Sequence, residues 1–301
     1  MRELSGTALS TAAGFGCCQK RPAMVGKLPK LTVKKVYMQK ILKEVHAHMP
    51  YELLPSYLDL ILQKKINPEI YFNHSALDNL DKEECLRIAA TLKEAGLKIT
   101  FHAPFMDLRP GALDKSIRQA SLNRIRQAFD LAFIFRPLRI VCHPSFDHRY
   151  YVSCDELWLQ NSAATWRELL DMAAQADTVI ALENTYEKEP SILRRLLEML
   201  PSERLCFCFD TGHFNVFSAT TLDIWLAELG KYIGQLHLHD NYGKTDEHLP
   251  VGNGIFPFAR LFQFLREEKI NPVITLEAHA ASDLQQSATN IEEMGLFKGM
   301  V

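Results

Sequence analysis

The chain has 301 residues, 47% of them apolar, which is enough to build one large α/β domain or two smaller ones. Its 34 Lys and Arg nearly balance 36 Asp and Glu, so the bulk positive charge of a nucleic-acid-binding protein is absent, and no apolar run reaches the ~20 residues of a membrane-spanning helix. The 7 cysteines form no CxxC pair and no disulfide framework, which indicates a reduced, cytoplasmic protein.

Residues 1–34 differ in composition from the rest of the chain. They are rich in Ser, Thr, Ala and Gly and show no helical or strand periodicity, so we expect a disordered N-terminal tail ahead of one domain at 35–301. A weak signal peptide and a true start near Met24 are alternative interpretations. The basic segment 36–45 fits either a helix or a strand.

Eight short segments, most of them apolar, alternate with amphipathic helical segments from here to the C-terminus. The predicted strands are 44–48, 69–72, 98–102, 139–143, 178–183, 205–210, 234–240 and 272–277, and the predicted helices are 57–64, 81–95, 115–135, 158–176, 191–200, 222–229 and 258–269. This alternation predicts a closed (β/α)8 TIM barrel. An open doubly wound sheet is the alternative, and the lack of a GxGxxG or P-loop after the first strand disfavours it.

Most of the predicted strands end on a side chain that can bind a metal ion. These ends are His102 in FHAP, His143 in VCHP, Glu183 in ALEN, Asp210 with His213 in CFDTGH, His237 in LHLHD and Glu277 in TLEAH, and Asp246 and His248 follow in a loop. The carboxyl ends of barrel strands meet at one rim, where clustered carboxylates would repel one another without a cation. The pattern therefore predicts a divalent metal enzyme.

The residues two positions before these strand ends support the same arrangement. Side chains alternate along a strand, so Val141, Ala181, Cys208 and Thr275 should point into the barrel with the donors above them. All four are small or compact, as a barrel interior requires. Cys206 shares this parity and should also lie inside.

Taken together, these segments resemble the xylose-isomerase-like barrel superfamily. The resemblance rests on FHAP (101–104), CHP (142–144), LEN (182–184), FDTGH (209–213), HLHDN (237–241), DEHLPVGNG (246–254) and LEA (276–278), and it extends over residues 44–298. This superfamily contains the sugar phosphate isomerases and epimerases and the endonuclease IV group.

The resemblance to the sugar enzymes implies one divalent ion, Mn, Zn, Co or Mg, held by Glu183, Asp210, His237 and Glu277. Glu183 and Glu277 would be the catalytic pair, moving a proton at the carbon next to a carbonyl. Substrate contacts are expected from a further set of residues: His213, His102, His239, Lys244 and Phe105. A small carbohydrate is the expected partner, and a homo-oligomer is compatible with the sequence.

The resemblance to the endonuclease IV group implies up to three zinc ions and hydrolysis of a phosphodiester at abasic sites in DNA. The additional ligands would be His102, His143, His213, Asp246 and His248, all of which are present. A compact loop between His237 and Asp246, and His239 where the nuclease pattern has Asn, favour the sugar enzyme. A non-catalytic metal-binding barrel is a third alternative. His74, His148 and His279 are expected at the surface or behind the donors.

Overall fold

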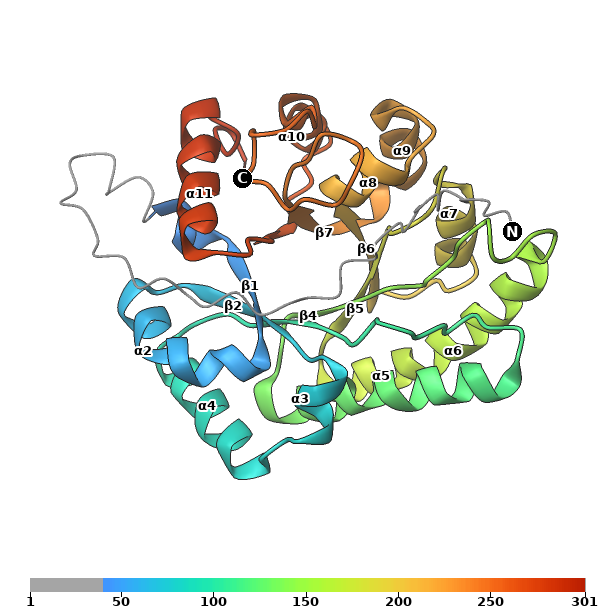
Figure 1. The fold of residues 1–301 in the computed structure, drawn as a ribbon, viewed down its shortest axis with the longest axis horizontal. Helices are drawn as coiled ribbons and strands as arrows, with labels where there is room; N and C mark the ends of the chain where they lie inside the picture. Colours follow the sequence, from blue (N-terminus) through green and yellow to red (C-terminus); the bar gives the residue numbers. More distant parts are fainter. Residues whose placement is uncertain (1–39, 301) are drawn as a thin grey trace, which may run out of the picture. The chain divides into compact units, whose positions relative to one another are not determined.

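The computed structural model describes residues 40–300, so the predicted disordered tail lies outside the described residues. Eight parallel strands close into a barrel in the order β1 to β8, with helices around it (Figure 1). The fold predicted from the sequence, a (β/α)8 TIM barrel, is therefore confirmed. None of the helices in this part of the chain combines the length and apolar character needed to cross a lipid bilayer.

The strands and helices follow one another in strict alternation around most of the barrel. The strands are β1 (His46–Pro50), β2 (Asn67–Tyr71), β3 (Thr100–His102), β4 (Arg139–Cys142), β5 (Val179–Glu183), β6 (Leu205–Asp210), β7 (Ile233–Leu238) and β8 (Val273–Leu276). The α-helices are α2 (Leu54–Lys64), α3 (His74–Asp78), α4 (Lys82–Glu94), α5 (Lys115–Phe135), α6 (Asp155–Ala176), α7 (Ser191–Glu198), α8 (Thr211–Phe217), α9 (Leu222–Leu229), α10 (Phe258–Glu267) and α11 (Ala281–Met294). Two 3-10 turns, η1 (Tyr51–Leu53) and η2 (Gly230–Tyr232), complete the set.

The ends of the helices follow from local sequence chemistry. The carboxylate of Asp81 accepts backbone N–H bonds in the first turn of α4, and Asp114 does the same for α5. These caps satisfy donors that have no partner inside the helix. The chain then leaves α5 and α6 through Arg136 and Asp177, which adopt positive φ angles of 51° and 53°.

The first strand and three helices differ from the sequence prediction. Residues 40–44 are helical, so β1 begins two residues later than expected. The helices α3, α8 and α11 were not predicted. The first two span only 5 and 7 residues, which is too short for a helical apolar period to be recognised, and α11 buries only Ser287, Ala288 and Ile291.

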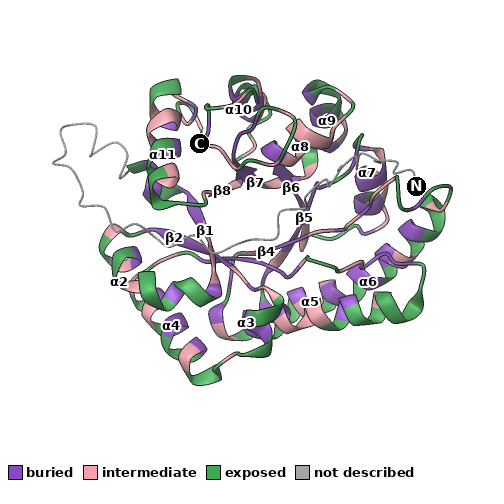
Figure 2. Ribbon diagram, in the orientation of Figure 1, coloured by how far each residue is buried: buried purple, intermediate pink, exposed green. Residues whose placement is uncertain are grey.

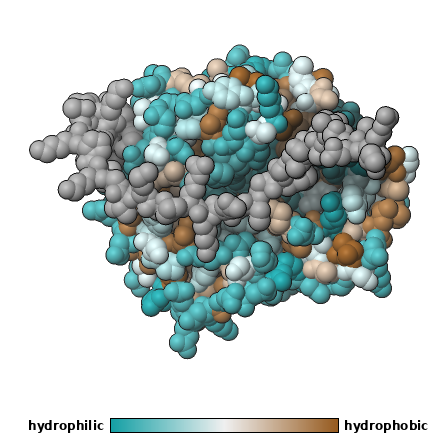
Figure 3. All heavy atoms as spheres, in the orientation of Figure 1, coloured by the Kyte–Doolittle hydropathy of each residue, from teal (hydrophilic) through white to brown (hydrophobic). Residues whose placement is uncertain are grey.

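Two hydrophobic layers hold the barrel together. The larger lies between the strands and the helices, and Figure 2 shows the helices turning their buried residues toward the sheet. The smaller lies inside the barrel and consists of Val141, Ala181 and Cys208, with Cys206 packed against it. The predicted inward parity of these residues is confirmed. On the face drawn in Figure 3, hydrophilic side chains predominate and apolar ones are scattered.

Candidate metal centre

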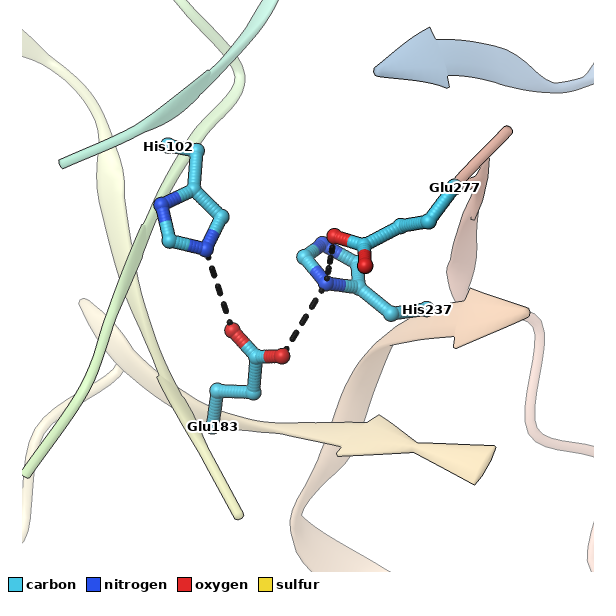
Figure 4. A group of neighbouring side chains, drawn as sticks. All are labelled: His102, Glu183, His237 and Glu277. Carbon is cyan, nitrogen blue, oxygen red and sulfur yellow. Dashed lines mark hydrogen bonds and ion pairs between the residues drawn. The ribbon is translucent and has the colours of Figure 1, made fainter. Parts of the chain in front are cut away.

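Four predicted donors meet at the carboxyl end of the barrel, where three carboxylates surround one imidazole nitrogen of the fourth residue, His237. His237 Nδ1 lies 2.9 Å from Glu277 Oε1, 3.2 Å from Glu183 Oε1 and 3.9 Å from Asp210 Oδ2. Figure 4 shows Glu183 and Glu277 approaching the His237 ring from two different strands. We call Glu183, Asp210, His237 and Glu277 the central set. All four side chains are buried.

A second set shares Glu183 with the first. The other carboxylate oxygen of this residue, Oε2, lies 3.0 Å from His143 Nε2 and 3.3 Å from His102 Nε2. The two oxygens of Glu183 therefore face different donors. A carboxylate placed in this way can bind two neighbouring cations, or it can use one oxygen to hold a cation and the other to move a proton.

A third set surrounds Asp246 in the loop after β7. Its Oδ2 atom lies 3.0 Å from His248 Nε2 and 3.5 Å from His213 Nε2, while Oδ1 lies 3.6 Å from His239 Nδ1. Two carboxylate oxygens and three imidazoles thus gather within a few ångströms of one another. The nine residues named as possible ligands from the sequence all converge on one rim, and their role as ligands stays a prediction.

Asp210 joins the third set to the central one. It is the last residue of β6 and also the N-cap of α8, where its Oδ1 accepts the backbone N–H of His213 at 2.6 Å. Its Oδ2 lies 3.0 Å from Nε2 of His239, whose ring passes directly over Gly212. A Cβ at Gly212 would collide with that ring, which explains why glycine stands in the DTGH segment.

Backbone carbonyls set the orientation of two histidines. The Nδ1 atom of His102 lies 2.9 Å from the Ala103 carbonyl oxygen, and that of His213 lies 3.0 Å from the Asn184 carbonyl oxygen. A carbonyl oxygen only accepts, so Nδ1 carries the proton in both rings. In the neutral form of each ring, Nε2 then carries the lone pair, facing Glu183 in one case and Asp246 in the other, which is the arrangement of metal-binding histidines.

The electrostatics of the centre depend on the histidines taking up positive charge. Burial disfavours the charged forms, but the histidines around Glu183 and Glu277 hold the pKa of both carboxyl groups well below its usual range. In return, Cys208 and the neighbouring carboxylates raise the pKa of His237 well above normal, and Asp246 and Glu277 raise that of His248 to about 9. Binding of a cation would therefore displace protons from these imidazoles.

The donor set fits divalent cations. Within residues 40–300, buried atoms without a hydrogen-bond partner include His143 Nε2, Glu183 Oε2, His239 Nδ1, Asp246 Oδ1 and His248 Nδ1. Unsatisfied buried polar atoms are rare, so a group of them in one place needs an additional partner. Imidazole and carboxylate are the ligands of Zn²⁺ and related ions, so the residues present fit a metal ion as that partner.

The loop that carries Asp246 and His248 is tied at its base by Asp240. The Oδ1 atom of this side chain accepts the backbone N–H groups of Asn241 and Phe256, and Oδ2 accepts those of Gly252 and Gly254. A pair of backbone hydrogen bonds also joins Asp240 to Leu249. The two ends of the loop are therefore held together at Asp240, where the loop leaves and rejoins the barrel. We call this point the neck.

Sequence reasoning missed two residues at the centre, Glu69 and His48. Glu69 on β2 is wholly buried, and its Oε1 lies 2.9 Å from His237 Nε2. His48 on β1 lies 3.4 Å from Glu69 and 3.6 Å from Glu277. The available signal was a charged residue at position 69 beside an apolar run. It stands at the first position of the predicted strand 69–72 and not at a strand's carboxyl end, where the candidate ligands were sought.

The predicted substrate contacts lie in different environments. His239 is buried against Asp210 and stacks on His248, with ring centroids 3.9 Å apart. Phe105 is half-buried and stacks on His143 at 4.4 Å. Lys244 is exposed on the loop after β7. Exposed His279, expected outside the donor set, stacks on His248 at 4.4 Å.

Comparison with known proteins identifies the class to which this barrel belongs. The family model described as "Xylose isomerase-like TIM barrel" matches residues 68–298, and the chain therefore belongs to this family. The resemblance inferred from the strand-end motifs is confirmed. A solved structure titled as a D-tagatose 3-epimerase-like protein has a TM-score of 0.71 at 24% identity, covering 83% of this chain and 96% of the other.

Two curated relatives cover different shares of this chain. An uncharacterized protein of Methanocaldococcus jannaschii is 28% identical over 204 residues, which cover 65% of this chain and 70% of that protein. A Mycobacterium ulcerans protein named "Probable endonuclease 4" is 28% identical over 131 residues, covering 42% of this chain and 49% of its own length. The sequence is thus similar to an uncharacterized archaeal protein over about two thirds of its length and to a protein named as an endonuclease over a shorter stretch.

Proposed function

We propose that the protein is a metal-dependent isomerase or epimerase of a sugar or sugar phosphate. The observation that carries this proposal is the pair of buried glutamates, Glu183 and Glu277, that reach the same His237 nitrogen from separate strands. A substrate bound between them would present one carbon to two carboxyl groups. The resemblance to sugar epimerases supports the carbohydrate class of the substrate.

The two glutamates would share one proton transfer. When bound, a divalent cation supplies stabilisation for the negative charge that develops on the substrate oxygens. One carboxylate removes the proton from the carbon next to the carbonyl, and the other carboxyl group returns a proton to the same carbon from its second face. Burial excludes water from both groups, which strengthens their interaction with the developing charge.

Hydrogen exchange with solvent tests this proposal directly. The protein, loaded with Mn²⁺, Co²⁺ or Zn²⁺, is incubated in D2O with a panel of ketoses and ketose phosphates. We expect deuterium at the carbon next to the carbonyl, and loss of this exchange in Glu183→Gln. The matched control is Glu187→Gln, which changes another buried glutamate outside the three donor sets. Absence of exchange across the whole panel would reject the proposal.

Hydrolysis of a phosphodiester is the second candidate, and the five donors outside the central set favour it. His102 and His143 face the outer oxygen of Glu183, and His213, Asp246 and His248 form a set of their own. Several adjacent cations can orient an attacking water and stabilise the leaving oxygen.

Metal counting and a DNA substrate separate the two candidates. One ion per chain with no cleavage favours proton transfer, whereas three ions and cleavage of duplex DNA containing an abasic site favour hydrolysis. His143→Ala and His248→Ala sharpen the distinction because they leave the central set intact. They should abolish hydrolysis but leave hydrogen exchange measurable. Tight metal binding without either reaction would instead identify a non-catalytic barrel.

A further inference from the structure

Glu69 is a charged side chain inside the barrel that belongs to none of the three donor sets. It lies on β2 and is wholly buried. Its Oε2 atom accepts three hydrogen bonds: from Gln235 Nε2 at 2.6 Å, from Thr275 Oγ1 at 2.8 Å and from Thr100 Oγ1 at 2.9 Å. These donors come from β7, β8 and β3. Three partners on one oxygen fix the carboxylate in place, and the other oxygen, Oε1, lies 3.4 Å from Nδ1 of His48.

That second oxygen faces the back of the central histidine. Glu69 Oε1 lies 2.9 Å from His237 Nε2, on the ring edge remote from the nitrogen that Glu183 and Glu277 approach. The two ring nitrogens of an imidazole point in different directions. Glu69 therefore cannot serve the cation that Nδ1 would bind, and it must act on that cation through the ring.

We infer that Glu69 is a positioning residue that keeps the proton of His237 on Nε2 and its lone pair on Nδ1. A carboxylate only accepts hydrogen bonds, so it favours the tautomer with the proton on the nearer nitrogen. The free lone pair then faces Glu183, Asp210 and Glu277. This inference rests on the proposed metal at the central set, and it goes beyond it by assigning the group that prepares His237 for the metal.

The neighbouring donors show why this histidine needs a carboxylate. His102 and His213 each have a backbone carbonyl beside Nδ1, and that carbonyl fixes the tautomer. His237 has no such carbonyl contact among the described residues, and both of its ring nitrogens face carboxylates. Without Glu69, the carboxylates at Nδ1 would draw the proton to the wrong side. A mutation of such a supporting residue typically costs about 10–100-fold in metal affinity.

The first test measures the tautomer in the unaltered protein. In the metal-free chain with ¹⁵N-labelled histidine, ring nitrogen shifts and one-bond N–H couplings, assigned with His237→Gln, report which nitrogen carries the proton. We expect the neutral His237 ring to be protonated at Nε2 once the pH is high enough to remove the second proton. A proton on Nδ1 would overturn the inference, whatever the variants do.

The second test measures zinc affinity by competition with a chromogenic chelator. Glu69→Gln should weaken zinc binding at the central set by about 10–100-fold, whereas the control Glu187→Gln should leave it unchanged. Thr275→Val removes one of the three bonds to the far oxygen of Glu69 and keeps the charge. It should weaken zinc binding by less than Glu69→Gln does, because two bonds still hold the carboxylate. Unchanged zinc affinity in Glu69→Gln would contradict the inference. Failure of the unaltered protein to bind any metal would instead remove the proposed function, and the tautomer measurement would still decide the role of Glu69.

Discussion

Two layers of side chains line the barrel interior, two residues apart along the same strands, and they differ in chemistry. The lower layer holds Val141, Ala181 and Cys208, which pack against one another as a buried apolar cluster. The upper layer holds His143, Glu183 and Asp210, which face one another across the rim. Side chains alternate along a strand, so on β4, β5 and β6 the apolar packing residue and the candidate ligand lie two positions apart and point to the same side.

The lower layer itself is divided between apolar and polar strands. On β4, β5 and β6 it is apolar, whereas on β2, β3, β7 and β8 it holds the hydrogen-bonded group of Glu69, Thr100, Gln235 and Thr275. The polar half lies against His237, the only imidazole of the central set. Small apolar residues let the barrel close, and the polar group fixes a ligand from below. Stability and site geometry are thus supplied by different strands of one layer.

The largest effect is expected in the upper layer, from Glu183→Gln. The substitution keeps the shape of the side chain but removes its ability to accept a proton. We expect the rate of hydrogen exchange into a sugar substrate to fall by about 10²–10⁴-fold, the usual contribution of a general base. The measurement is deuterium incorporation by the metal-loaded variant. A rate equal to that of the unaltered protein would rule out Glu183 as the base.

Metal loading should stabilise the upper layer strongly. A ligand that binds only the folded state raises the free energy of unfolding by about 4 kcal/mol at a thousand times its Kd. Urea unfolding with and without saturating Zn²⁺ checks this expectation, and a chelator should reverse the gain. If the midpoint of unfolding does not move with metal, the donor sets do not bind it.

A buried carboxyl group outside the donor sets provides a contrast with Glu183. Burial raises the pKa of Glu187 from 4.5 to about 7, because too few partners compensate its charge. Its stabilising contribution is present below pH 4.5 and is lost as the pH rises through 7, which amounts to about 3 kcal/mol. We expect Glu187→Gln to be more stable than the unaltered protein at pH 8, by about that amount, and similar to it near pH 4.5. Urea unfolding at both pH values measures the difference, and a pH-independent difference would contradict the assignment.

The smallest effect is expected in the apolar half of the lower layer. Ala181→Val adds two methyl groups beside Val141 and Cys208, where the described structure is closely packed. Such overpacking costs typically about 1–3 kcal/mol of unfolding free energy. The number of bound metal ions should stay the same, since Glu183 remains on the strand. Loss of metal without loss of stability would show that the two layers are not separable in this way.

Much of the fold could be predicted because the signals are local. An apolar run followed by a metal-binding side chain identified β4, β5 and β6 closely, and the bounds of α5 and α9 match the predicted ranges. The helix α8 could not be seen because Asp210 ends β6 and caps the helix with no linker between them. β1 was placed two residues too early because a short helix at 40–44 ends almost directly before it, and the sequence shows no turn signal between them.

The convergence of most candidate donors could be predicted because they stand at or directly after a strand end, whereas the position of Glu69 could not. Its role depends on barrel closure, which brings β2 to the back of a histidine on β7, and its bond to Gln235 spans 166 positions in the chain. No pattern along a single strand reports such a contact. The burial of His239 is likewise not visible along a single strand, since it depends on Gly212 leaving room for the ring.

The neck formed by Asp240 separates one pair of donors from the rest. Asp246 and His248 sit on an excursion whose two ends are bonded to the same carboxylate, while the other candidate ligands belong to the strands or to the first turn of α8. This loop could be replaced as a unit without altering the register of the barrel strands. In proteins built on this scaffold, the number of bound metal ions would then depend on the sequence of one loop.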